Sequence, residues 1–101
     1  MYGLLDRDLH YILEALKKFD EIESVILFGS RAMGNYKKGS DVDIALKGGK
    51  ISSEVMSELD EMLNEVNPLP YFFDIIHYEA VNNDNLIEHI DKVGKELYRK
   101  E

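Results

Sequence analysis

The sequence predicts an α+β fold in which helices pack on one face of a small mixed β-sheet. Three observations support this class. Apolar residues recur at helical spacing in three long segments, three short segments are rich in β-branched and aromatic residues, and the two kinds of segment alternate along the chain. A chain of 101 residues is expected to form a single domain, residues 1–101, around one core.

The first predicted element is an amphipathic helix over residues 6–19, with Asp6 as its N-cap. Its apolar residues recur every three or four positions: Leu5, Leu9, Ile12, Leu13, Leu16 and Phe19. Residues 24–28 are typical of a strand that is buried on both faces, and this strand ends at Gly29. Glycines in the next segment predict one short helical turn and a loop over residues 30–40.

Residues 41–46 are predicted to form a second strand, because apolar side chains alternate there with a period of two. The core-facing set is Val42, Ile44 and Leu46. The opposite set is Asp41, Asp43 and Ala45. One face of this strand is therefore expected to belong to the core, and the other to be uncovered and charged.

Two further helices and a third strand complete the prediction. Ser52 or Ser53 is the expected N-cap of a helix that Asn67 and Pro68 should end. Its apolar residues are Val55, Met56, Leu59, Met62, Leu63 and Val66. Residues 71–78 are expected to form a strand. After a polar loop over residues 82–85, a closing helix is predicted from Leu86, Ile87, Ile90, Val93, Leu97 and Tyr98.

The composition excludes several classes of function. The sequence has no cysteine, which excludes disulfides, thiolate metal sites and cysteine nucleophiles. A net charge of −8 opposes general binding to nucleic acid. No apolar stretch is long enough to cross a bilayer and no export signal is visible, so we expect a cytoplasmic protein without membrane contact.

Three aspartates stand on predicted strands, where aspartate is uncommon and an unpaired carboxylate near the core is costly. Asp41 and Asp43 are two positions apart, so both project to one side and can reach one hard divalent cation, for which Mg²⁺ is the candidate. Because Mg²⁺ sites are usually completed by substrate phosphates, the pattern indicates a nucleotide triphosphate. Asp74, if its strand is adjacent, would bind a second metal ion and take a proton from an attacking hydroxyl.

A candidate phosphate site precedes these acids. Gly29 and Ser30 lie where a strand ends and a helical turn begins, so backbone N–H groups there can face an anion. Residues 29–40 contain basic residues and no acid, which suits a triphosphate. Arg31 and Ser40 are therefore counted as nucleotide-binding candidates with Gly29 and Ser30. The two lysines of this stretch, Lys37 and Lys38, are more typical of a solvated loop.

Each part of the pattern also has an ordinary interpretation. A Gly-Ser pair is a common turn, and alternate aspartates on a strand usually mark a solvent face. Their combination favours a site. The three histidines share no metal-ligand spacing: His77 is interpreted as structural or exposed, and His10 and His89 as ordinary surface residues of amphipathic helices.

The motif FGS at residues 28–30, followed after ten residues by DVDI at 41–44, resembles the signature of the polymerase-beta-type nucleotidyltransferase superfamily. The motif FDI at 73–75 resembles the context of its third carboxylate. Since little extends beyond this core, the chain is similar to the minimal nucleotidyltransferases, the small antitoxin-type branch often paired with a HEPN-domain protein. The resemblance implies the polymerase-beta-like nucleotidyltransferase fold.

The resemblance also implies a mechanism. Gly29 and Ser30 would hold the nucleotide phosphates, Asp41 and Asp43 would bind Mg²⁺, and Asp74 would serve as metal ligand and base. AMP would pass from ATP to a hydroxyl of a helical HEPN-like partner. The partner would be an RNA-cleaving toxin, and the transfer would neutralise it. The chain has no accessory domain for an acceptor, so a second chain is expected to hold it, in a homodimer or a hetero-oligomer.

Two other functions stay open at this point. In the first alternative, the chain is a non-catalytic antitoxin that neutralises its partner by covering the partner's surface. A third function is nucleotidylation of a small cationic molecule such as an aminoglycoside, with a helper chain, because the acidic surface would attract such a molecule.

Overall fold

The computed structural model describes residues 1–66 and 69–101. Its helices and strands, in chain order, are α1 (Asp6–Lys17), β1 (Ser24–Phe28), α2 (Gly29–Met33), β2 (Val42–Lys47), α3 (Ser53–Glu61), β3 (Phe73–His77), α4 (Asp84–Val93) and β4 (Lys95–Arg99). The sheet order is β3-β2-β1-β4. Strand β1 runs antiparallel to β2 and β4, and β2 runs parallel to β3. The predicted α+β class with a mixed sheet is confirmed.

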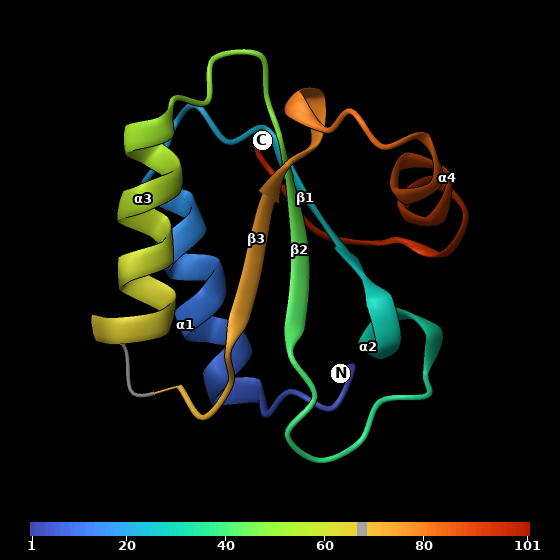
Figure 1. Ribbon diagram of the computed structural model, residues 1–101. Helices are drawn as coiled ribbons and strands as arrows, with labels where there is room; N and C mark the ends of the chain where they lie inside the picture. Colours follow the sequence, from blue (N-terminus) through green and yellow to red (C-terminus); the bar gives the residue numbers. More distant parts are fainter. Residues whose placement is uncertain (67–68) are drawn as a thin grey trace.

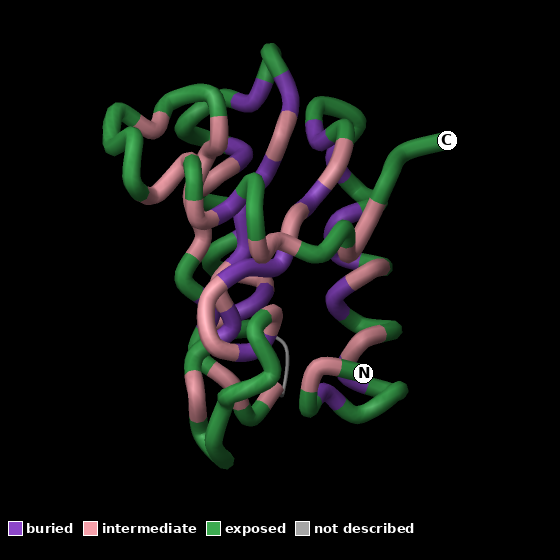
Figure 2. The backbone as a smooth tube through the Cα atoms, turned by 90° about the vertical axis from the view of Figure 1, so that its right-hand side faces the viewer, coloured by how far each residue is buried: buried purple, intermediate pink, exposed green. Residues whose placement is uncertain are grey.

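The sheet lies between two layers of helices (Figure 1). Helices α1 and α3 cover one face, where the main core gathers apolar side chains from these helices and from β1, β2 and β3. On the other face α4 packs against the sheet through a small cluster of Phe28, Ala45 and Ile90. Helices on one face were expected, and α1 and α3 meet that expectation, whereas α4 covers part of the opposite face. Buried residues are densest in β1 and β2, whereas β4 has no fully buried residue, and Figure 2 shows how burial varies along the backbone.

The ends of the helices test the predicted caps. Ser52 caps α3 as expected, because its hydroxyl accepts a hydrogen bond of 3.2 Å from the amide of Val55. Asp6 was expected to cap α1, but this prediction is wrong. The cap position is Leu5, and Asp6 is the first helical residue, where its charge favours the positive end of the helix dipole.

A π-helical segment, Met62–Val66, continues α3. It carries Asn64 to the edge strand β3, where its side-chain oxygen accepts from the amide of Phe73 at 2.7 Å and its side-chain nitrogen donates to the carbonyl of Phe73 at 3.0 Å. These two bonds satisfy backbone groups that would otherwise face outward at the edge of the sheet. The stop predicted at Asn67 and Pro68 lies outside the described residues.

The predicted closing helix is too long. It ends at Val93, and Leu97 and Tyr98 belong instead to the fourth strand, β4. The reason is Gly94, whose extended backbone lies so close to the carbonyl of Ile90 and to Ile26 that a side chain would collide there. A bulge in the pairing of β4 with β1 then lets both apolar residues of β4 pack against the main core. No helix within the described residues is long and apolar enough to cross a lipid bilayer.

Candidate functional site

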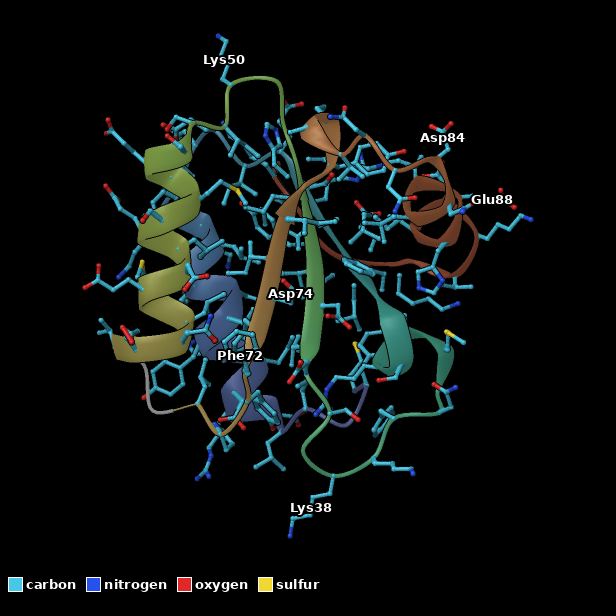
Figure 3. The ribbon with its side chains drawn as sticks, in the orientation of Figure 1. Lys38, Lys50, Phe72, Asp74, Asp84 and Glu88 are labelled. Carbon is cyan, nitrogen blue, oxygen red and sulfur yellow. The ribbon has the colours of Figure 1, made fainter. Side chains whose placement is uncertain are left out.

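Strand pairing brings two of the predicted aspartates together. Asp43 of β2 pairs with Phe28, the last residue of β1, and on its other side with Asp74 of β3. Paired residues on neighbouring strands project to the same face of a sheet. Asp43 and Asp74 are therefore neighbours on the face that α4 partly covers, and Figure 3 shows Asp74 on β3 next to β2.

Gly29 lets the Asp43 carboxylate rest directly against the turn that follows β1. The backbone of Gly29 has φ +72°, in the left-handed region that favours glycine. A Cβ atom added at Gly29 would collide with the carboxylate of Asp43. The expected proximity of the Gly-Ser turn and the paired-acid strand is thus present, and it depends on the absence of a side chain at Gly29.

Asp41 lies immediately before β2, where it is exposed. Burial raises the pKa of the Asp43 carboxyl, and the nearby negative charges of Asp74 and then Asp41 raise this pKa further. A positive charge on the His89 imidazole would oppose the rise. Asp74 and Asp41 are therefore both within electrostatic reach of Asp43, and a cation would relieve the repulsion that Asp43 feels from them.

The chemistry of this acid cluster suits a hard divalent cation, because Mg²⁺ is bound in proteins by carboxylate oxygens together with water and substrate phosphates. Within residues 1–66 and 69–101, however, no three carboxylate or imidazole groups form a closed set around a common metal position. The arrangement is an open acidic cluster on which a ligand would have to supply part of the coordination.

Arg31 was predicted to contact a nucleotide, and the structure places it differently. Its side chain is only 3% exposed. The guanidinium donates to the carbonyl of Tyr2 at 2.9 Å and to the carbonyl of Ser40 at 2.8 and 3.3 Å. It also lies over the rings of Tyr36 and Tyr71, 5.3 and 5.1 Å from their centroids. Arg31 therefore holds the end of the loop that leads into β2.

Ser40, the other predicted contact in this loop, also serves the loop itself. Its hydroxyl accepts from the amide of Lys37 at 2.8 Å, and its carbonyl receives the Arg31 guanidinium. Lys37 and Lys38 are exposed, as expected, and Figure 3 shows Lys38 at the tip of the loop. Of the four nucleotide-binding candidates, Gly29 thus lies against Asp43 and Ser30 follows it in the turn, whereas Arg31 and Ser40 shape the approach to β2.

His89 is the residue that sequence reasoning missed. It was interpreted as an ordinary surface histidine of the closing helix, but the amide of Gly29 donates to its Nε2 at 3.1 Å. Its half-buried ring meets the ring of Phe28 edge-on, with centroids 6.1 Å apart and an interplanar angle of 81°. The available signal was its place on the apolar face of α4, three residues after Leu86 and next to Ile90.

The other two histidines follow the prediction. His77 is half-buried, and its Nε2 lies 2.9 Å from the carbonyl oxygen of Gly48 and 3.3 Å from Glu79, so it is structural. His10 is exposed on α1, 3.8 Å from Glu14.

Solved structures share this fold. A chain of a toxin–antitoxin crystal structure with AMP-PNP matches with a TM-score of 0.75 and 22% identity, covering 96% of this chain and 76% of that one. A chain of a solved structure, that of the tri-AMPylated Shewanella oneidensis HEPN toxin in complex with MNT antitoxin, matches with a TM-score of 0.70 and 20% identity. The match covers 99% of this chain and 74% of that one. A chain of the toxin–antitoxin MntA-HepT matches with a TM-score of 0.69 and 19% identity, covering 95% and 74%.

No curated protein matches the sequence. The family model described as polymerase beta, nucleotidyltransferase matches residues 10–101. This match spans nearly the whole chain and includes the Gly29–Ser30 turn and all three acids of the cluster. The chain belongs to the polymerase beta nucleotidyltransferase family.

Proposed function

We propose that this chain is a Mg²⁺-dependent nucleotidyltransferase that moves AMP from ATP to a hydroxyl of a partner protein. One observation carries the proposal: Asp43 lies between Asp74 on one side and the Gly29 backbone on the other. A carboxylate pair and a strand-to-helix turn thus meet where metal-bound phosphates would have to lie. Family membership supports the transfer of a nucleotidyl group, and an AMP-PNP complex of similar fold supports ATP as the donor.

The proposed reaction exchanges one bond to the α-phosphorus for another. The acceptor hydroxyl oxygen forms a bond to the α-phosphorus, the bond from that phosphorus to the oxygen bridging to the β-phosphorus breaks, and pyrophosphate leaves with the electron pair. The hydroxyl proton passes to the carboxylate of Asp74, which is exposed beside Asp43. Asp43, with Asp41 and Asp74 near it, would supply part of the coordination of Mg²⁺ and the phosphates the rest, and the ion would neutralise charge on the phosphate oxygens when bound.

A HEPN-domain-like helical protein is the proposed acceptor. Similar structures include an AMPylated HEPN toxin in complex with an MNT antitoxin, which supports an antitoxin role for this chain. We place the acceptor hydroxyl on this partner, in a hetero-oligomer with the chain. Because the donor is ATP, the reaction belongs in the cytoplasm.

Label transfer from ATP tests this proposal. The purified chain is incubated with Mg²⁺, ATP labelled in its α-phosphate, and a HEPN-domain protein as the acceptor. We expect label on the partner with the wild type, and none with Asp43→Asn. A matched control is Asp20→Asn, because the Asp20 side chain is 95% exposed and lies 3.8 Å from the Lys100 ammonium.

The same variants separate the alternatives. Labelling that survives in Asp43→Asn would rule out catalysis by the acid cluster. If no label is transferred by the wild type, and Asp43→Asn still binds and neutralises the partner, the chain is a non-catalytic antitoxin. Label on an added aminoglycoside but not on the partner would favour the small-molecule enzyme.

A further inference from the structure

The turn between β1 and α2 is tied to a distant part of the chain. The amide of Gly29 donates to the Nε2 of His89 at 3.1 Å, a contact between residues 60 positions apart. Gly29 is the first residue of α2, so its amide has no partner within that helix. The imidazole of α4 therefore satisfies a donor that would otherwise point outward at the acid cluster.

This contact determines which hydrogen-bond donors of the turn are already occupied. A nitrogen that accepts a hydrogen bond carries no proton, so Nε2 of His89 is the unprotonated ring nitrogen. The Gly29 amide is committed to it and is not free for a phosphate. Ser30, the next residue, has an amide without a partner within α2 and a hydroxyl, and both can donate to an anion.

His89 is itself held firmly. The next residue, Ile90, is 2% exposed and packs with Phe28 and Ala45 on the sheet. The helix is fixed at its start by Asn83, whose side chain accepts from the amide of Leu86 at 3.1 Å. Because α4 is anchored on both sides of this residue, the imidazole can fix the position of the Gly29 turn.

We propose that His89 is a positioning residue of the nucleotide site, which holds the Gly29 amide so that the turn stays against Asp43 and presents Ser30 to the phosphates. The inference rests on the proposed function for the identity of the ligand, and extends it by giving α4 a part in the site. The imidazole acts through the backbone of Gly29 and does not touch the reacting atoms.

Two substitutions at His89 separate a hydrogen-bonding role from packing. His89→Gln keeps an acceptor, since a glutamine amide oxygen reaches about as far as Nε2. His89→Leu keeps apolar bulk and removes the acceptor. His10→Leu is the matched control, because His10 is exposed on α1, where its imidazole lies 3.8 Å from Glu14. Each variant is measured by equilibrium titration with Mg²⁺ and ATP, and by hydrogen exchange at the Gly29 amide.

We expect His89→Leu to bind ATP about fivefold more weakly and to exchange the Gly29 amide about fivefold faster, which is the effect of one lost hydrogen bond. His89→Gln and His10→Leu should match the wild type within about twofold in both measurements. Rescue by glutamine is the result that a packing role would not give.

Three results would overturn the inference. Equal ATP affinity in all variants would show that His89 does not position the site. Tighter binding by His89→Leu would show that the Gly29 amide is a phosphate donor which His89 blocks. An equal loss in His89→Gln and His89→Leu would assign the effect to packing. If the wild type binds no ATP, the proposed function fails, and the exchange rate of Gly29 alone then decides whether His89 holds the turn.

Discussion

The contact between Gly29 and Asp43 is testable by adding a single methyl group. In Gly29→Ala, the new Cβ meets the Asp43 carboxylate, and the residue must also keep φ +72°. The left-handed backbone costs an L-residue about 1–2 kcal/mol, and overpacking against a neighbouring side chain costs about 1–3 kcal/mol. We therefore expect the free energy of unfolding to fall by about 2–5 kcal/mol.

Gly34 supplies the matched control. It has φ +84°, and a Cβ added there meets nothing within 4 Å. Gly34→Ala should therefore cost only the backbone term, about 1–2 kcal/mol. Combining Gly29→Ala with Asp43→Ala removes the collision, so in that background the glycine substitution should also cost about 1–2 kcal/mol.

Urea unfolding followed by circular dichroism measures these differences, and label transfer measures their effect on activity. A carboxylate displaced by about 1 Å should lower the rate about a hundredfold in Gly29→Ala, with little change in Gly34→Ala. Equal destabilisation by the two alanine variants, or the same cost of Gly29→Ala with and without Asp43, would refute the contact.

Three further substitutions test the surroundings of the site. Asp43→Asn should stabilise the fold at neutral pH. The folded-state pKa of Asp43 is raised, so its ionisation opposes folding as the pH rises above the ordinary value of 3.8, and the gain, followed by unfolding at several pH values, should vanish in acid. Ile90→Ala should lower the free energy of unfolding by about 2–5 kcal/mol, and an effect well below that range would mean that α4 is not packed on the sheet. Arg31→Lys keeps the charge but loses the forked contact with Ser40, so the free energy of unfolding should fall by about 1–3 kcal/mol with ATP affinity little changed; a selective loss of ATP affinity would make Arg31 a nucleotide ligand instead.

The parts of the site that sequence reasoning predicted are those encoded by local patterns. A period of two along residues 41–46 placed Asp41 and Asp43 opposite the core face, and glycine followed by serine marked the turn after β1. These signals depend on neighbouring residues alone. The pairing of Asp43 with Asp74 required only that the two strands be adjacent.

What the sequence could not give was contact between distant elements. The contacts of Arg31 depend on where the fold places the carbonyls of Tyr2 and Ser40. The role of His89 depends on the packing of α4 on the face of the sheet opposite α1 and α3. Neither has a local signature. The end of α4 was misplaced because Leu97 and Tyr98 continue a helical spacing, although Gly94 carried the opposite signal.

Binding of Mn²⁺ together with a non-hydrolysable ATP analogue, followed by electron paramagnetic resonance, tests most directly whether Asp41, Asp43 and Asp74 share one nucleotide site. We expect the wild type to form the ternary complex, and each aspartate-to-asparagine variant to bind Mn²⁺ about tenfold more weakly or worse, while Asp20→Asn binds as the wild type does. Wild-type affinity in Asp43→Asn would contradict the shared site.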